Sequence, residues 1–590
     1  MKSRTSCCNG TILKKTLLRG APLWGMYLLL WTVMMPMRIY PTENWYRIQS
    51  LEQYILELGV MGGNYMPAIY GLFSACMVFS YLYKSRSANF YAALPVKRQT
   101  MFLTNYLAGL LYALAPNLLI ALVCLPAGAL YGTSLVWELL VWFGCHTLNY
   151  VFYYSFAVLL AMIVGHLVAL PLLYVVLNFT VIVVESIIRQ LMSYFVYGLY
   201  FHGNFLFDWA SPLAYSCLQG EGPDVNSVYL DGEFVRWELS GMDYLAALAV
   251  VGVVFAVLAF FLHQYRRMES AGDVIAVRRL KPVFLYCFTA GCSLLIGYVM
   301  AELLIRDLSF AAVLACMLVG ATIGYFAGQM MLHKSMRVFR KRHWVNWAAS
   351  CLVISAVMLC VRFDMLGYTS YVPETDEIQA VSVTYTSDFS EDPALIEQVR
   401  ELHQLCLDRR DEEVAGEPYY TSLYLSYALK DGSVVERQYD LPINTELSQD
   451  ADSLVRRYES IWNDPDYILV RTLPQGYTAQ DIEMCHIYNE NGDEFYLTKQ
   501  QAYDFLKTVL EPELRETTLG WDIWSEHAQE LQSSFTGIYI DIVFRENISG
   551  EFVPTFYSGV TYDCQRILAF AAEHGIEPTE EELAETDEAW

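Results

Sequence analysis

The stretch LLVWFGCHTLNYVFYYSFAVLLAMIVGHLVALPLLYVVLNFTVIVV, residues 139–184, decides what kind of chain this is, because its 46 residues contain no charge. As α-helix it would be about 69 Å long, whereas the hydrocarbon core of a bilayer is about 30 Å thick. The stretch therefore predicts two membrane crossings, with a tight turn at Gly165-His166 between them. We expect a multi-pass α-helical membrane protein.

Seven other stretches between consecutive charged residues are also long enough for one crossing each. One of them, 99–137, is longer than needed, and Pro126, Gly128 and Gly132 predict that its helix ends near residue 130. The nine predicted spans are 20–37, 58–83, 103–130, 139–163, 167–184, 244–265, 282–301, 308–333 and 343–361.

The charge of the chain divides at the end of the ninth span. The whole chain of 590 residues has a net charge of −25 although 55% of its residues are hydrophobic. Residues 1–363 carry a net charge of +9 and residues 364–590 carry −34, so an apolar, mildly basic membrane part precedes an acidic soluble part. The acidic part would repel phosphate, which argues against nucleic acid as a partner.

The basic residues predict how the spans are oriented. Five segments outside the predicted spans, taken alternately along the chain, hold 19 of the 25 Lys and Arg of the membrane part. They are 1–19, 84–98, 165–166, 266–281 and 334–342. By the positive-inside rule they face the cytoplasm, which places the N-terminus inside and the C-terminal part outside a plasma membrane. No cleavable signal peptide is predicted, because 20–37 is too long for one and lacks a small-residue cleavage site.

Residues 364–576 are predicted to form an extracytoplasmic α+β domain. A strand at 380–386 and an amphipathic helix at 393–407 come first. Hairpin-then-helix patterns follow around Asp431-Gly432, Asn491-Gly492 and Ser549-Gly550, so the domain is either one unit or a set of repeated units. The acidic tail 577–590 is predicted to be disordered.

This acidic domain carries no recognisable catalytic or metal-binding motif. Its histidines, His403, His486, His527 and His574, are scattered, and HExxH and GxSxG patterns are absent from the sequence. We therefore expect neither a catalytic residue nor a metal site. Its acidity indicates either a solvated surface or an attraction for cations and cationic peptides.

Two of the basic loops have distinctive sequences. Residues 90–98, FYAALPVKR, are amphipathic and lead into MFLTNYLAGL at 101–110. Residues 266–272, RRMESAG, are followed by Leu280-Lys281-Pro282. The residues alone favour a simple interfacial anchor for the first loop.

Both segments resemble loops of the type-2 ABC transporter permeases of Firmicutes, which often carry further spans and a C-terminal outer domain. In that family the first loop contacts the ATP-binding subunit and transmits its closure. The resemblance implies a second permease subunit, in a homodimer or heterodimer. It also implies that coupling residues lie in the two loops, namely Phe90, Leu94, Pro95, Val96, Lys97, Arg98, Glu269 and Gly272.

The sequence has no GxxxxGK[ST] motif and no Gly-Lys pair, so it lacks the loop that cradles ATP phosphates. We expect no enzymatic activity and no cofactor on this chain, with ATP bound by a separate ATPase subunit that drives an exporter. The alternative is a membrane sensor with an extracytoplasmic ligand-binding domain. A membrane-anchored outer enzyme is a third class, which the missing motifs disfavour.

Polar residues within the predicted spans are candidates for a transport pathway, because a polar group in lipid is costly. They are Asn117, His146, Asn149 and Asn178. Such residues also bridge neighbouring helices without touching any substrate. The aromatic loop between the fifth and sixth spans, 185–243, is either an interfacial belt or, by the family resemblance, a set of short re-entrant helices that form an outer gate.

Overall fold

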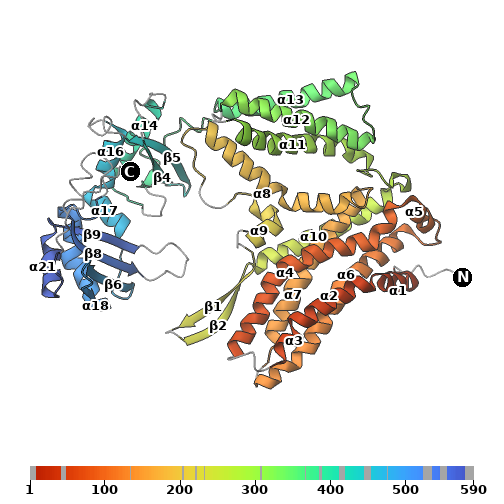
Figure 1. Cartoon of the computed structure of the whole chain (residues 1–590), viewed down its shortest axis with the longest axis horizontal. Coiled ribbons are helices and arrows are strands. Elements are labelled where there is room, and N and C mark those ends of the chain that lie inside the picture. The colour runs from red at the N-terminus through yellow and green to blue at the C-terminus, as the bar shows by residue number, and fades with distance from the viewer. Residues whose placement is uncertain are drawn as a thin grey trace. The chain divides into compact units, whose positions relative to one another are not determined.

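The computed structural model describes residues 8–41, 48–132, 134–201, 205–218, 222–230, 233–305, 309–365, 367–383, 389–410, 419–443, 453–474, 476–521, 535–544 and 555–578. The chain forms two compact units (Figure 1). The first, which we call the helical unit, comprises Met1–Leu191 and Gly203–Leu359. The second, the sheet unit, comprises Met192–His202 and Cys360–Trp590.

Eight helices within the described residues are long and apolar enough to cross a membrane. They are α4 (Ile48–Phe79, continued by a 3₁₀ turn to Tyr83), α6 (Arg98–Cys124), α7 (Val136–Ile163), α8 (Ala169–Phe195), α10 (Met242–Tyr265), α11 (Lys281–Leu304), α12 (Phe310–His333) and α13 (Lys341–Arg362). Each corresponds to one predicted span, and Val164 to Val168 interrupt the helix where the turn at Gly165-His166 was predicted.

The first predicted span is a broken helix rather than a straight one. α1 (Gly10–Arg19) meets α2 (Ala21–Met34) and α3 (Pro36–Ile39) at an angle of 61°, and only as a pair do they count as a ninth span. Pro22 lies in the first turn of α2, where a missing backbone N–H costs nothing, and Gly20 precedes it at the bend. Nine spans therefore require this bent pair to be counted as one crossing.

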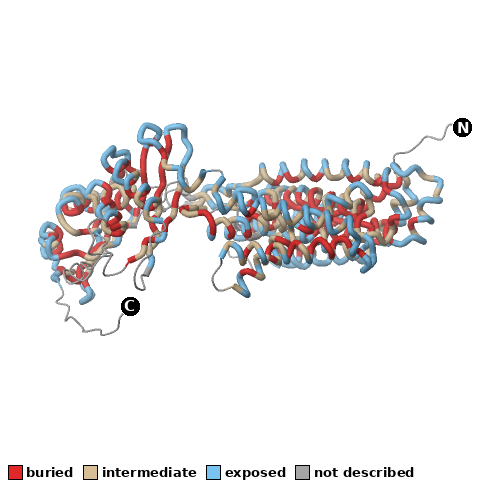
Figure 2. Tube along the Cα trace, turned by 90° about the horizontal axis from the view of Figure 1, so that it is seen from above, coloured by how far each residue is buried: buried red, intermediate tan, exposed pale blue. Residues whose placement is uncertain are grey.

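Glycines allow the helices of this unit to pack closely. A Cβ on Gly71 of α4 would lie 2.8 Å from the backbone nitrogen of Tyr154 of α7, and one on Gly252 of α10 would lie 2.6 Å from the Cα of Phe152. Close backbone approach of this kind is typical of helices that associate in lipid. Large apolar side chains such as Leu352 and Val353 of α13 remain exposed, and exposed residues, in pale blue, alternate with buried ones along the helices of the chain (Figure 2).

The segment between α8 and α10 contains a strand hairpin that neither expectation included, and the interfacial belt stays a prediction. α8 continues beyond the predicted end at residue 184 to Phe195, and α9 (Pro212–Leu218) is a short helix. The strands β1 (Asp224–Leu230) and β2 (Glu233–Ser240) form an antiparallel hairpin, whose sequence signal is an Asp-Gly pair between alternating residues. Of the proposed re-entrant helices, the described part of this segment contains only the short α9.

The sheet unit contains two antiparallel sheets, one of three strands in the order β3-β4-β5 and one of four in the order β7-β6-β8-β9. The first consists of β3 (Ile378–Ser382), β4 (Tyr419–Leu429) and β5 (Val434–Ile443), with α14 (Pro393–Asp408), α16 (Leu454–Trp462) and α17 (Pro465–Thr472) nearby. The second consists of β6 (Ile482–Asn489), β7 (Glu494–Tyr496), β8 (Phe535–Phe544) and β9 (Thr555–Thr561), packed against α18 (Lys499–Phe505), α19 (Glu511–Glu516) and α21 (Gln565–Glu573).

The mixed helix and strand content predicted for this part is confirmed, and Thr498 and Gln501 form the capping box that their spacing predicts. The order of hairpin and helix recurs three times. The hairpins are not equivalent in pairing, however, because the second and third join in one sheet through β6 and β8. Repetition therefore stays a prediction. The turn at Ser549-Gly550 and the tail from residue 579 lie outside the described residues.

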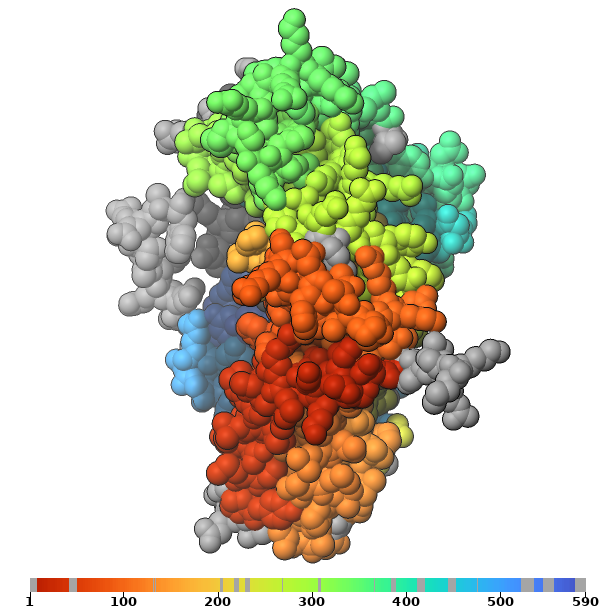
Figure 3. All heavy atoms as spheres, turned by 90° about the vertical axis from the view of Figure 1, so that its right-hand side faces the viewer, coloured from red at the N-terminus to blue at the C-terminus, as the bar shows by residue number. Residues whose placement is uncertain are grey.

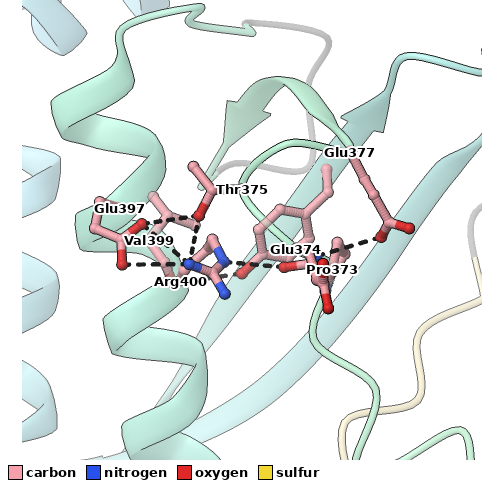
Figure 4. A network of polar contacts seen from close by, with 8 residues as sticks. Pro373, Glu374, Thr375, Glu377, Glu397, Val399 and Arg400 are labelled. Atoms are coloured by element: carbon pink, nitrogen blue, oxygen red, sulfur yellow. Dashed lines mark hydrogen bonds and ion pairs between the residues drawn. The ribbon is translucent and has the colours of Figure 1, made fainter.

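Two chain segments connect α8 and α13 to the first sheet. After α8, Leu199 pairs with Arg437 of the edge strand β5, and the backbone N–H of Gln438 donates to the carbonyl of Gly198 at 3.3 Å. After α13, the segment 373–377 is fixed to α14 by Arg400 (Figure 4). The guanidinium donates to the carbonyl of Pro373 at 2.9 Å and to the Thr375 hydroxyl at 2.6 Å, and pairs with Glu397 at 3.0 Å.

Candidate coupling site

The two loops that resemble permease loops lie together at one end of the helical unit. The short helix α5 (Ser85–Ala92) contacts the 3₁₀ turn Met268–Ser270. Arg98 donates from Nη1 to the carbonyls of Gln264 at 3.1 Å and Arg266 at 3.2 Å, which joins the start of α6 to the end of α10. Seen from this end, the orange residues of the first loop adjoin the yellow-green residues of the second (Figure 3).

Helix α5 is attached by one face and leaves another free. Ala88 is fully buried, and the ring of Tyr91 packs 4.5 Å from that of Tyr81. Phe90, next to Tyr91, remains 64% exposed. The helix ends at Ala92 because Leu94 precedes Pro95, and the residue before a proline disfavours helical geometry. The result is an exposed aromatic side chain on a well-anchored turn of helix.

A buried arginine connects the second loop to the end of α7. Arg266 is only 3% exposed. It donates to the backbone carbonyls of Ala161 and Met162, the latter at 3.1 Å, and its guanidinium lies 5.7 Å from the centre of the Tyr83 ring. These contacts satisfy carbonyls that have no partner within α7, since the last four carbonyls of a helix lack intrahelical donors.

The predicted turn after α7 contacts the second loop directly. Val164 and Ile275 form an antiparallel bridge, and the N–H of Gly272 donates to the carbonyl of Gly165 at 2.6 Å. A Cβ on Gly165 would lie 2.4 Å from the carbonyl oxygens of Ser270 and Asp273, so a glycine is required there. Gly272 has a φ of +91°, a conformation that glycine adopts without strain.

An ion pair adds the loop after α12 to the same group. The carboxylate of Asp273 lies 2.7 Å from the ammonium of Lys334 and 3.2 Å from that of Lys281. The hydrogen bond from Lys334, followed by that from Lys281, lowers the pKa of Asp273. These contacts join the loops into one structure, which we call the loop cluster. It comprises segments 84–98, 163–166 and 264–281 together with Lys334.

The structure places all the predicted coupling residues in this cluster. Arg98 is exposed but makes the hydrogen bonds described above. Of the other residues, four are exposed, namely Phe90, Pro95, Lys97 and Glu269, and three are half-buried, namely Leu94, Val96 and Gly272. Sequence reasoning did not single out Arg266, Asp273 or Lys334. Arginine and aspartate at the boundary of a span are explained by interfacial solvation as readily as by tertiary contacts, so the sequence carried no separate signal for them.

The predicted pathway residues contact both their own helices and neighbouring ones. Asn149 donates to the carbonyl of Gly63 at 2.8 Å and so bridges α7 to α4, and Asn178 donates to the carbonyl of Tyr174 on its own helix at 2.8 Å. His146 donates from Nδ1 to the Trp142 carbonyl at 3.0 Å and packs against Trp31. Asn117 is fully buried beside Tyr27. Asn149 thus bridges two helices, Asn178 bonds within its own helix, and a pathway role stays a prediction for all four residues.

Comparison of the chain with protein-family models, with curated proteins and with solved structures finds no match. Among the described residues, no group of three or more His, Cys, Asp and Glu is placed to hold a metal ion.

Proposed function

We propose that this chain is the membrane-spanning permease subunit of an ATP-binding-cassette exporter, driven by a separate ATPase subunit. The observation that carries the proposal is the loop cluster, in which an exposed aromatic side chain is mounted on segments that connect to four helix ends. An aromatic side chain on a rigid support is the kind of residue that dominates a protein interface.

The contacts of the loop cluster support a route for mechanical coupling. A force on α5 reaches α6 through the short segment 93–97, and α10 through the hydrogen bonds of Arg98. It reaches α7 through Arg266, whose charge is buried and whose donors are directed at the end of that helix. Displacement of Phe90 by a closing partner would therefore move several span ends together.

The meeting of the loops also supports the predicted orientation. Segments predicted to face the cytoplasm lie at the same end of the helical unit, as an even number of crossings between them requires. In the proposal this end faces the cytoplasm of a plasma membrane and meets the ATPase. The sheet unit lies outside, and a second permease subunit, identical or different, completes the transporter.

Affinity purification in mild detergent, with quantification of any ATP-binding-cassette subunit that accompanies the chain, tests the proposal. Phe90→Ser should reduce recovery of that subunit at least 30-fold, because losing an interface anchor costs about 2 kcal/mol or more. Phe207→Ser is the matched control, since Phe207 is likewise 55% exposed but follows α8 in a loop predicted to face outward. It should leave recovery unchanged.

A preparation of the wild-type chain that contains no such ATPase would refute the proposal. That result would favour the alternative, a membrane sensor with a ligand-binding sheet unit, because a sensor needs no ATPase. Equal loss of the ATPase in both phenylalanine variants would instead show that Phe90 has no specific role in coupling.

A further inference from the structure

One face of the four-stranded sheet in the sheet unit is built differently from the other. The inward face carries Cys485, Ile487, Ile540, Ile542 and Phe556, all of them buried against the helices of this sheet. The outward face carries polar and aromatic side chains at the alternate positions of the same strands. We call this outward face the ring face.

Aromatic rings extend across all four strands of the ring face. His486 of β6 is directly opposite Tyr496 of β7 on one side, and their rings stack at 4.1 Å. Tyr488 of β6 is directly opposite Tyr539 of β8, with ring centres 5.5 Å apart, and Tyr539 stacks at 6.0 Å on Tyr557 of β9. Tyr496 is 55% and Tyr557 61% exposed, so both ends of this row are open to solvent.

A carboxylate lies among these rings. Asp541 is opposite His486 on one side and opposite Tyr557 on the other. Within the described residues its carboxylate makes no hydrogen bond and no ion pair, although it is half-buried. Its charge can therefore pair with a cation brought to this face. Two further carboxylates border the rings, Glu494 at 3.1 Å from His486 and Glu490 at 2.8 Å from the Tyr539 hydroxyl.

We propose that the ring face binds a cationic peptide, with the ammonium or guanidinium groups of its Lys and Arg side chains placed on the exposed end rings of Tyr496 and Tyr557 and paired with Asp541. Aromatic faces attract such cations, and the attraction strengthens where a carboxylate is close. The net charge of −34 on residues 364–590 concentrates cations near this surface.

The shape of the ring face favours a peptide over a small amine. Four strands at about 4.8 Å spacing form a flat surface about 14 Å wide between the outer strands, whereas small ligands are usually enclosed in concave pockets. An extended chain can place several cationic side chains on such a surface at once. A neutral sugar would use the rings but would leave Asp541 without its counter-charge.

The test is fluorescence anisotropy with the purified full chain in nanodiscs and a fluorescein-labelled peptide of alternating Lys and Gly. A peptide with Glu in place of Lys and a neutral N-acetylglucosamine oligomer serve as comparison probes. The double variant Tyr496→Ser/Tyr557→Ser should weaken binding of the Lys peptide at least 10-fold, and Asp541→Asn should weaken it about as much. The ring-retaining double variant Tyr496→Phe/Tyr557→Phe should bind like the wild type.

Tyr420→Ser is the matched control, because Tyr420 is 62% exposed but lies on β4 of the other sheet. It should not change binding. If the serine double variant binds the Lys peptide as well as the wild type does, binding arises from net charge alone and the proposal is wrong. Ring-dependent binding of the sugar in place of the peptide would also overturn it. This assay contains no ATPase, so its outcome is independent of the proposed transport function.

Discussion

The attachment of α8 to the sheet unit depends on Gly198, and Gly198→Ala tests that attachment. Gly198 has a φ of +72°, and its carbonyl accepts the hydrogen bond from Gln438 of β5. A Cβ at this position would lie 2.6 Å from the Tyr439 ring, well inside normal contact distance. Tyr439 cannot move freely, because it is 2% exposed and packs against Tyr197 and His403.

Two costs add up in this variant. A left-handed conformation costs a residue with a Cβ about 1 kcal/mol, and displacing a packed ring costs about 1–3 kcal/mol more. If a total of about 3 kcal/mol falls on the local contact, its opening becomes about 100-fold more frequent, since 1.4 kcal/mol corresponds to a factor of ten. Amide exchange from local opening should accelerate by the same factor.

Hydrogen exchange of the full chain in detergent, followed by mass spectrometry of peptides covering β5, measures this effect at Gln438. Gly432→Ala is the control, because Gly432 has a φ of +86° and no atom within 4 Å of an added Cβ. It should accelerate exchange of the Leu429 amide, which donates across that turn, only about 5-fold, as expected from about 1 kcal/mol. Equal acceleration in both variants would refute the packing argument, because it would leave only the cost of the conformation.

Two further predictions concern buried charged and titratable groups. Burial, and then the charge of Arg437, lowers the pKa of His403 to about 3, so the folded sheet unit keeps this residue neutral while the unfolded chain protonates it below about pH 6.5. The free energy of unfolding contributed by the neutral histidine is therefore fully present above pH 6.5 and falls toward pH 3. Pulse proteolysis should detect a loss of up to about 2 kcal/mol between pH 6.5 and 5, and His403→Phe should abolish that loss. An unchanged slope of stability against pH in that variant would contradict the assignment. Arg266→Met should destabilise the helical unit by about 3 kcal/mol in detergent, seen as a lower midpoint of thermal unfolding, because both helix-end carbonyls lose a charged donor and only that of Ala161 keeps another, the Tyr83 hydroxyl. The exposed neighbour variant Arg267→Met should have almost no effect, and similar losses in both would show that the buried contacts of Arg266 are unimportant.

Apolar runs and turn chemistry could be predicted from the sequence because they depend on neighbouring residues alone. The sequence did not predict where a helix continues through a charged residue. Residue 184 was the predicted end of the fifth span because Glu185 follows, yet α8 continues through it to Phe195. Glu185 pairs with Arg189 one turn later at 2.7 Å and accepts the backbone N–H groups of Leu206 and Phe207. A charge with such partners does not need to end a helix, and the partners from 205–207 could not be identified by spacing.

The same continuation explains how α8 is joined to a sheet whose strands begin nearly two hundred residues later. The last residues of α8 belong to the sheet unit, and the segment after them pairs with β5. Edge strands offer unpaired backbone groups to any extended segment, so sequence alone does not determine which segment fills this edge. Once filled, the edge connects α8 to β5 through hydrogen bonds and the packed ring of Tyr197, which donates to the Cys406 carbonyl at 3.1 Å. Opening of this edge must break these contacts, and this is why Gly198 is the position at which the pairing is best tested.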